Sequence, residues 1–402
     1  MMRHIWKLVW NRKRANALIV IEILASFLVL YAVTLVGVYF AHNYRQPLGF
    51  SYDRVWLVEI DWQRESIELQ PELEEEKEAA MMRQLLTAVK EFPEVESAAA
   101  MSVVPYSNST YSSGFTWKGR QVEFMFNRGT TDTAQVLDMH LTAGRWFTEA
   151  DAAGSSFRPV VINRRLAREL FGTENPLGQV VKEEQDKVER RVIGVLEDFR
   201  KDGEFSGLQS YMFEHATLGK SKGGQPNNFV LRVRPGVTAA FEEKLTGKLR
   251  SMAPTWGFEV KPIEQMREST LLWQLIPLTI FGVIVGFLLI MVSLGLLGVL
   301  WQNVTQRTKE IGLRRALGAT AGEVYAQIVS ELLVVSTFGL SLGILAVIQF
   351  PLLKVVDFIS PTVYFTSLVI SLGIVYGLTV LCGLYPGWLA TRVQPSEALH
   401  YE

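Results

Sequence analysis

The sequence predicts a membrane protein, α-helical with four transmembrane helices, and with an α+β extracytoplasmic domain of two lobes inserted between the first and second helix. Three observations predict this fold class. Four long stretches carry almost no charge, two short segments are rich in Lys and Arg, and the segment between the first two apolar stretches has the mixed composition of a soluble domain.

Each apolar stretch exceeds the roughly 20 residues that a helix needs to span a bilayer. The stretches are residues 15–44, 269–306, 332–353 and 358–391. The membrane helices expected within or overlapping them are 17–40, 272–300, 324–350 and 363–386. The first apolar run is too long for a signal peptide and no A-x-A site follows it, so we expect an uncleaved anchor.

The positions of basic residues predict the orientation. Residues 1–16 hold five Lys or Arg and no acid, and residues 307–315 hold four. By the positive-inside rule both segments should be cytosolic. Residues 41–271 should then be extracytoplasmic, 351–362 should form a short outer loop, and the tail 387–402 should be cytosolic. We expect a multi-pass protein of the bacterial inner (cytoplasmic) membrane with both termini in the cytosol.

Charge and cysteine content limit what the large segment can bind. Residues 41–271 contain 29 basic and 34 acidic residues, which gives no long-range attraction to nucleic acid. The single cysteine, Cys382, lies in the last apolar stretch, so the domain should be built without disulfides.

Two strand–helix–strand patterns lie at the ends of this segment. The first has strands at 55–60 and 95–104 around a helix at 71–92, whose apolar face we assign to Leu73, Ala80, Met81, Leu85, Ala88, Val89 and Phe92. The second has strands at 227–236 and 257–263 around a helix at 237–252. They predict one lobe split over 50–104 and 227–268. Residues 105–226 should form the inserted lobe, with strands at 122–129, 159–163 and 190–196 and a helix at 164–172.

The cytosolic segment 301–323 has defined stop and start signals. Glu310 and Arg314 stand four apart on a helix with the acid first, and Gly318 can end that helix. Thr320 and Glu323 form a capping box before the next helix. The segment could simply touch anionic lipid. We favour a protein contact, because the signals fix the angle of the segment.

Three stretches resemble one protein family. "TKEIGLRRALGAT", the closing "YPGWLATRVQPSEALHYE", and "LTAGRWFTEAD" with "PVVINRRLARELFGTENPLGQVV" and "RRVIGVLEDFR" are similar to the FtsX-like, MacB-type permeases of ABC transporters. The resemblance covers most of the chain. It implies one membrane helix, a large extracytoplasmic domain of two lobes, and three further membrane helices.

The resemblance also implies a function. Such a permease takes up ATP-driven movement from a cytosolic ATPase subunit and passes it to the extracytoplasmic domain. The matching ATPase-coupling residues are Lys309, Glu310, Ile311, Gly312, Leu313, Arg314, Arg315, Ala316, Leu317 and Gly318. Residues expected along the inner membrane interface are Trp6, Trp10, Arg12, Lys13 and Arg14. Other expected partners are a second permease copy, identical or homologous, membrane lipid and a periplasmic adaptor.

The sequence lacks the motifs of an ATPase or another enzyme. It contains no G-x-x-x-x-G-K-[ST], so ATP and Mg²⁺ should bind a partner chain, unlike in the fused members of the family. The histidines show no metal-ligand spacing, and no G-x-S-x-G elbow is present. Asp198, Glu149 and Asp151 are better explained as turn and cap residues than as catalytic acids. We expect a non-catalytic subunit without a cofactor or metal.

Two acids and several glycines lie in the apolar stretches. Glu22 and Glu331 should sit on the order of 10 to 15 Å from the starts of their helices. Either acid could be functional, but an interfacial position is favoured. Four G-x-x-x-G pairs indicate close helix packing. They are Gly282 with Gly286, Gly339 with Gly343, Gly373 with Gly377, and Gly383 with Gly387.

Two functions remain open from the sequence. The first is export or extraction of a peptide, drug or lipoprotein. The alternative is a signalling or scaffold subunit that activates an extracytoplasmic enzyme such as a cell-wall hydrolase. The sequence does not identify a substrate, and "NSTYSSG" (108–114) fits a mobile loop or a substrate lip equally well.

Overall fold

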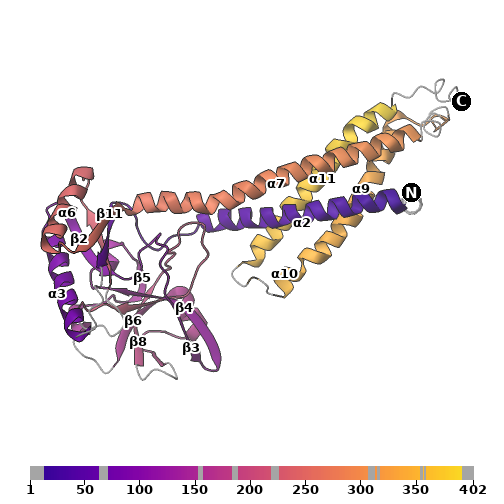
Figure 1. The fold of residues 1–402 in the computed structure, drawn as a ribbon. Coiled ribbons are helices and arrows are strands. Elements are labelled where there is room, and N and C mark those ends of the chain that lie inside the picture. The colour runs from indigo at the N-terminus through magenta and orange to yellow at the C-terminus, as the bar shows by residue number, and fades with distance from the viewer. Residues whose placement is uncertain are drawn as a thin grey trace. The chain divides into compact units, whose positions relative to one another are not determined.

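The fold is described from a computed structural model of the 402-residue chain. The described residues are 13–62, 71–152, 157–182, 189–218, 226–306, 313–314, 317–353, 356 and 359–391. The chain divides into two compact units, with boundaries at His42/Asn43 and at Gln274/Leu275. Residues 43–274 form one unit, here called the α/β domain. The described residues before and after it form the helical unit (Figure 1).

The elements follow the chain in this order: α2 Lys13–Tyr44, β1 Val55–Trp62, α3 Pro71–Lys90, β2 Val95–Met101, β3 Ser112–Trp117, β4 Arg120–Gly129, α4 Thr133–Val136, β5 Leu141–Gly144, η1 Glu149–Ala152, β6 Arg158–Asn163, α5 Arg164–Phe171, β7 Val180–Lys182, β8 Glu189–Leu196, β9 Tyr211–His215, β10 Asn228–Val233, α6 Ala239–Met252, β11 Trp256–Pro262, α7 Ile263–Gln306, α9 Ala321–Val347, α10 Gln349–Leu352 and α11 Pro361–Thr391.

The strands form one mixed sheet in the order β11-β1-β10-β2-β4-β9-β6-β8-β5, with β3 paired to β4 and β7 paired to β8. The strands of the two strand–helix–strand units lie together at one end, and those of the insertion lie at the other. The two groups meet at β2 and β4, where Met101 pairs with Gly129.

Alternation of side chains along β1, β2 and β10 builds a core on each face of that end of the sheet. Trp56, Val58 and Ile60 pack on one face with α3 and α6, while Val55 and Leu57 point to the other. Figure 1 shows α3 and α6 beside this end of the sheet. The second face shares its core with residues of the insertion, including Phe213. The insertion has a further core under α5.

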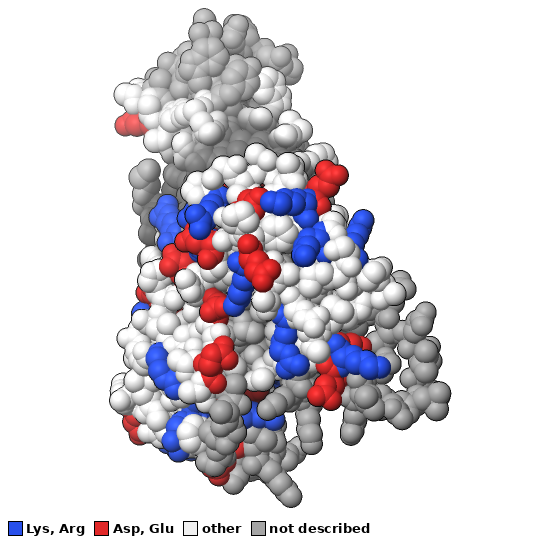
Figure 2. Space-filling model, turned by 90° about the vertical axis from the view of Figure 1, so that its left-hand side faces the viewer, with Lys and Arg blue, Asp and Glu red and all other residues white. Residues whose placement is uncertain are grey.

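The surface of the α/β domain carries both signs of charge. On the face that Figure 2 shows, the described basic and acidic side chains are interspersed. This distribution agrees with the near-neutral charge balance of the sequence.

The helical unit contains helices long and apolar enough to cross a membrane. The candidate spans are Ile19–Tyr44, Ile263–Gly298, Gly322–Leu352 and Pro361–Leu384. Glycine lets α2 approach α9 closely, because a Cβ on Gly343 would lie 2.4 Å from a ring carbon of Phe27. Gly339 likewise lies against Val20 and Ile23 of α2.

The other predicted glycine pairs behave differently. A Cβ on Gly282, Gly286, Gly373 or Gly377 would meet no described atom within 4 Å. Gly383 lies against α9, and Gly387 is a helical residue whose side-chain surroundings are not described. Among the described glycines of these four pairs, Gly339 and Gly343 make the closest approaches to a neighbouring helix.

Most predicted elements are present, and one predicted face is shifted. All strands and helices expected in 55–104 and 227–263 occur. On α3, however, Ala79 and Met82 are fully buried, whereas Ala80 and Met81 are only partly buried. The consecutive pairs Ala-Ala and Met-Met offered two nearly equivalent apolar faces. Pattern reading did not find the short strands β3, β5, β7 and β9.

We predict that Gly343→Ala destabilises the helical unit. The added methyl group meets the Phe27 ring, and overpacking typically costs about 1–3 kcal/mol. Gly373→Ala is the matched control, because its methyl group meets open space. The measurement is the thermal unfolding midpoint in detergent. A midpoint that falls equally in both variants contradicts the proposed α2–α9 contact.

Candidate functional site

The predicted turn before α9 is formed as the sequence indicates. Gly318 has φ +100°, and the Ala319 N–H donates to the Arg314 carbonyl at 3.0 Å, which is the hydrogen bond of a glycine-ended helix. Thr320 and Glu323 make both hydrogen bonds of the capping box. The direction of the chain entering α9 is therefore fixed by local hydrogen bonds.

A polar chain links this turn to α9. Arg314 donates from Nη1 to the Gln327 side chain. Gln327 in turn donates to Glu331 at 3.2 Å. Glu331 is therefore connected through one amide to the basic segment.

Of the predicted coupling residues 309–318, the structure describes Leu313, Arg314, Leu317 and Gly318. Leu313 and Leu317 are 52% and 79% exposed, so an apolar pair lies open beside Arg314. Lys309, Glu310, Ile311, Gly312, Arg315 and Ala316 lie outside the described residues, as do Trp6, Trp10 and Arg12. Lys13 and Arg14 begin α2, and their side chains are not described.

Glu22, the other acid in the predicted apolar stretches, lies at a contact between α2 and α7. A Cβ on Gly295 of α7 would lie 2.6 Å from a carboxylate oxygen of Glu22. The absence of a side chain at Gly295 makes room for this carboxylate. Glu22 and Glu331 thus have different surroundings, since Glu22 lies against Gly295 of α7 and Glu331 accepts a hydrogen bond from Gln327 of α9.

Within the α/β domain, a second group of contacts lies where α2 ends. We call residues 198–206 the junction loop. Its Arg200 is 2% exposed, and its Nη1 donates to the carbonyls of Asn43 at 2.8 Å and Gln46 at 3.0 Å. The same guanidinium donates to the carbonyls of Glu204 and Ser206. A buried cation therefore holds the carbonyl end of α2, where the helix dipole favours positive charge.

The first turns of α7 contact the same loop. Arg267 forms an ion pair with Glu204, which is itself buried. Gln274 donates to the Asp202 carbonyl at 2.9 Å. The two helices that have residues in both units are thus attached to one loop of nine residues, 198–206.

Close backbone contacts fix the junction loop further. Gly49, with φ +80°, passes so near the loop that a Cβ would lie 1.5 Å from the Asp198 carbonyl oxygen. Gly203 packs against the ring of Tyr106. Burial, and then the nearby Glu204 carboxylate, raise the pKa of Tyr106 strongly, so this phenol stays protonated.

The loop also holds the segment that follows Tyr106. Lys201, 2% exposed, donates from Nζ to the carbonyls of Ser107 at 2.9 Å and Ser109 at 3.0 Å. It also pairs with the Asp202 carboxylate. The positive charge of Lys201 is therefore buried with compensation, and residues 107–110 are attached to the junction loop.

Two of the three acids considered as catalytic candidates, Asp151 and Glu149, have structural partners. Asp151 accepts from Arg145 and from the Thr148 N–H, and the hydrogen bond from Arg145 is the main cause that lowers the pKa of Asp151. Glu149 accepts from Thr131 at 3.2 Å. Among the described residues, no group of three or more His, Cys, Asp and Glu side chains could hold a metal ion.

Sequence reasoning missed the junction loop. The only local signal was a run of charges with a glycine, "DFRKDGEF", directly after a buried strand. Its partners lie far away in the chain, since Arg200 and Asn43 are 157 positions apart. A contact between residues so far apart cannot be predicted from the spacing of residues in the sequence.

The fold and these sites define a multi-pass membrane protein whose α/β domain is joined to the membrane helices through α2 and α7. Residues 20–248 match the MacB-like periplasmic core domain, and residues 272–395 match the FtsX-like permease C-terminal domain. The chain belongs to the family of MacB-like, FtsX-type ABC transporter permeases.

Individual relatives agree with this family. The macrolide export ATP-binding/permease protein MacB of Bdellovibrio bacteriovorus is 31% identical over 64% of this chain and 41% of its own length. The uncharacterized ABC transporter permease YknZ of Bacillus subtilis is 29% identical over 66% of this chain and 67% of its own. The chain thus spans about two fifths of the length of the MacB relative.

A solved structure is also similar. The periplasmic region of MacB from Actinobacillus actinomycetemcomitans has 18% identity and a TM-score of 0.38, and the match covers 55% of this chain and 94% of that one.

We predict that Arg200→Ala destabilises the α/β domain, because four carbonyl groups lose a buried donor. The loss should be on the order of 3 kcal/mol, which corresponds to roughly 5 to 10 °C in the unfolding midpoint. The control is Arg234→Ala, which removes an exposed arginine of the same domain and should cost about 0.5 kcal/mol or less. Equal midpoints for the two variants would show that the Arg200 contacts contribute little.

Proposed function

We propose that this chain is the permease subunit of an ABC transporter and that it passes ATP-driven movement of a separate ATPase subunit to its α/β domain. One observation carries the proposal. Both helices that link the membrane spans to this domain are attached to the junction loop, α2 through Arg200 and α7 through Glu204. Movement of either helix would act on the same nine residues.

In this proposal, the basic turn before α9 receives the movement in the cytosol. Residues 307–315 contain four basic residues and residues 1–16 contain five, which favours the cytosol for both segments and for both termini. The α/β domain would then be extracytoplasmic at the inner membrane. The exposed Leu313 and Leu317 beside Arg314 give the ATPase subunit an apolar contact as well as a charged one.

Export or extraction is the favoured activity. Relatives are named for macrolide export and for probable syringafactin export, which supports an exported peptide, drug or lipoprotein as the substrate class. The names of relatives give no comparable support to the alternative of a signalling subunit that activates an extracytoplasmic hydrolase.

The proposal includes partner chains. The Bdellovibrio relative is named as a combined ATP-binding and permease protein, and the Bacillus relative as a permease. Since the sequence has no P-loop motif, ATP and Mg²⁺ would bind a separate polypeptide. A second permease copy, identical or homologous, would complete the transporter, with a periplasmic adaptor as a further partner.

We predict that the double variant Arg314→Glu with Arg315→Glu no longer co-purifies with the ATPase subunit, because reversed charges oppose docking. Membrane insertion should remain normal. The measurement is affinity pull-down of the ATPase from solubilised membranes, and cell fractionation checks insertion.

The matched control is Arg234→Glu, a charge reversal at an exposed position of the α/β domain. It should leave the pull-down unchanged. Normal ATPase recovery with the double variant would refute the assignment of this turn as the coupling site.

A further inference from the structure

Four charged side chains lie next to one another on one face of the sheet. Glu214 of β9 is 4% exposed and accepts a 2.9 Å hydrogen bond from Arg190 Nε of β8. Nitrogens of Arg158 and Arg128 lie 3.7 Å and 3.9 Å from the same carboxylate. Three guanidinium groups thus surround one carboxylate.

The register of the sheet explains why these residues meet. Arg128 of β4 pairs directly with Glu214 in the parallel ladder, and Arg158 of β6 pairs with Arg190. Alternation along β4 places Phe124 and Phe126 on the same face as Arg128. The cluster therefore continues a face whose apolar part is covered by α5.

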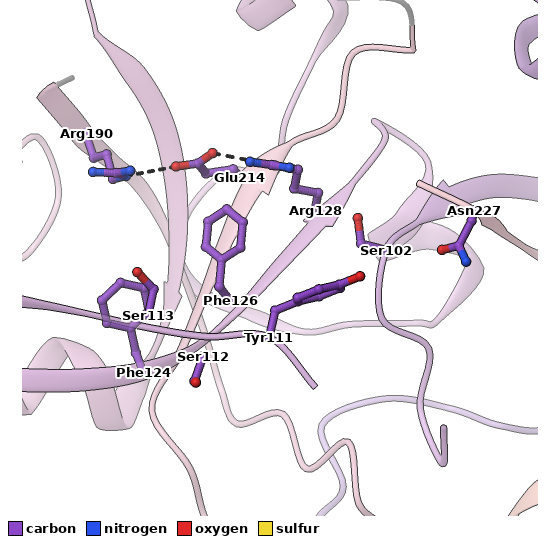
Figure 3. A pocket seen from close by; sticks show the side chains of 10 residues that line it. All are labelled: Ser102, Tyr111, Ser112, Ser113, Phe124, Phe126, Arg128, Arg190, Glu214 and Asn227. Carbon is purple, nitrogen blue, oxygen red and sulfur yellow. Dashed lines mark hydrogen bonds and ion pairs between the residues drawn. The ribbon is translucent and has the colours of Figure 1, made fainter. Parts of the chain in front are cut away.

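A pocket of about 360 Å³ opens beside this cluster. Figure 3 shows Glu214 between Arg190 and Arg128, with the ring of Phe126 below the carboxylate. The Arg128 guanidinium lies 5.1 Å from the centre of that ring. The remaining lining residues are hydroxyl, aromatic and amide side chains: Ser102, Tyr111, Ser112, Ser113, Phe124 and Asn227.

We propose that this pocket binds an amphiphilic anion. A carboxylate or phosphate group of the ligand is held by Arg128 and Arg190, and an adjoining apolar or aromatic part lies against Phe126 and Tyr111. The planar guanidinium fork matches both anionic groups, and serine hydroxyls can donate to their outer oxygens. The three guanidinium groups disfavour a cationic ligand, and a purely apolar ligand would take polar groups out of water without offering them new hydrogen bonds.

The pocket gives a role to a stretch that the sequence left undecided. Of residues 108–114, Tyr111 to Ser113 form one rim of the pocket, and Ser112 begins strand β3. This placement agrees with a lip over a ligand. The proposal does not depend on ATPase coupling, because a pocket that binds anions does so without a partner subunit.

The test is isothermal titration of the full chain in nanodiscs of zwitterionic phosphatidylcholine. The probes are N-acetyl-phenylalaninate and phenyl phosphate, and the neutral control is N-acetyl-phenylalaninamide. We expect saturable binding of the anions, at least about tenfold tighter than that of the amide. The absence of saturable anion binding, or equal affinity for the amide, overturns the proposal.

Variants make the test independent of folding. Arg128→Gln should weaken anion binding by about tenfold or more, while Glu214 keeps its hydrogen bond to Arg190. Glu214→Gln should tighten binding, because it removes the carboxylate that competes with the ligand. A folding defect would weaken both variants. Arg191→Gln, a neighbouring change of equal charge outside the pocket lining, should leave affinity unchanged. Equal effects of Arg128→Gln and Arg191→Gln contradict the assignment.

The source of the anion is distinguished by lipid composition. If lipid headgroups occupy the pocket, nanodiscs containing phosphatidylglycerol will weaken binding of the soluble probes in the wild type, and Glu214→Gln will increase this effect. If the ligand is a soluble amphiphile, the affinity will be the same in both lipids. Either result supports an anion site only when Arg128→Gln also weakens binding of the anionic probes.

Discussion

The hydrogen bonds of the buried Arg200 guanidinium attach the end of α2 to the junction loop, and the other contacts of this loop depend on them. A charge removed from water is tolerated only when dipoles or opposite charges replace the solvent. Here the replacement comes from backbone carbonyls at the end of α2 and within the junction loop itself. The carbonyl groups of Asn43 and Gln46 at the end of α2 therefore compensate the buried charge, and separating them from Arg200 would leave that charge without these partners.

The junction loop also contacts α7 and the segment directly before the rim of the pocket. Glu204 binds Arg267 in the first turns of α7, while Lys201 holds residues 107–110, directly before Tyr111. In the proposed mechanism, movement that enters along either helix would reach the segment that lines the pocket through these hydrogen bonds. In α7, Pro277 lies three residues past the domain boundary and cannot donate to the carbonyl of Trp273, which gives that helix a natural point to bend.

Local signals in the sequence were enough to predict much of this architecture. Long apolar stretches predict the four membrane helices, and Thr320 with Glu323 predicts the start of α9, because capping involves residues three apart. The junction loop and the pocket could not be predicted in this way. Arg128 and Glu214 are brought together by the pairing of β4 with β9, and Arg200 meets Asn43 only in the folded domain, 157 positions apart in the sequence. On α3, adjacent Ala and Met pairs left the buried face ambiguous by one residue.

The most direct test of the central claim is hydrogen–deuterium exchange of the full chain in nanodiscs with its ATPase subunit, with and without a non-hydrolysable ATP analogue. The account predicts that nucleotide changes exchange at backbone amides of residues 198–206 and 107–117. It also predicts that Glu204→Gln, which weakens the attachment of α7, reduces this change while the ATPase stays bound. Exchange in both segments that is insensitive to nucleotide, in a complex that hydrolyses ATP, would contradict it.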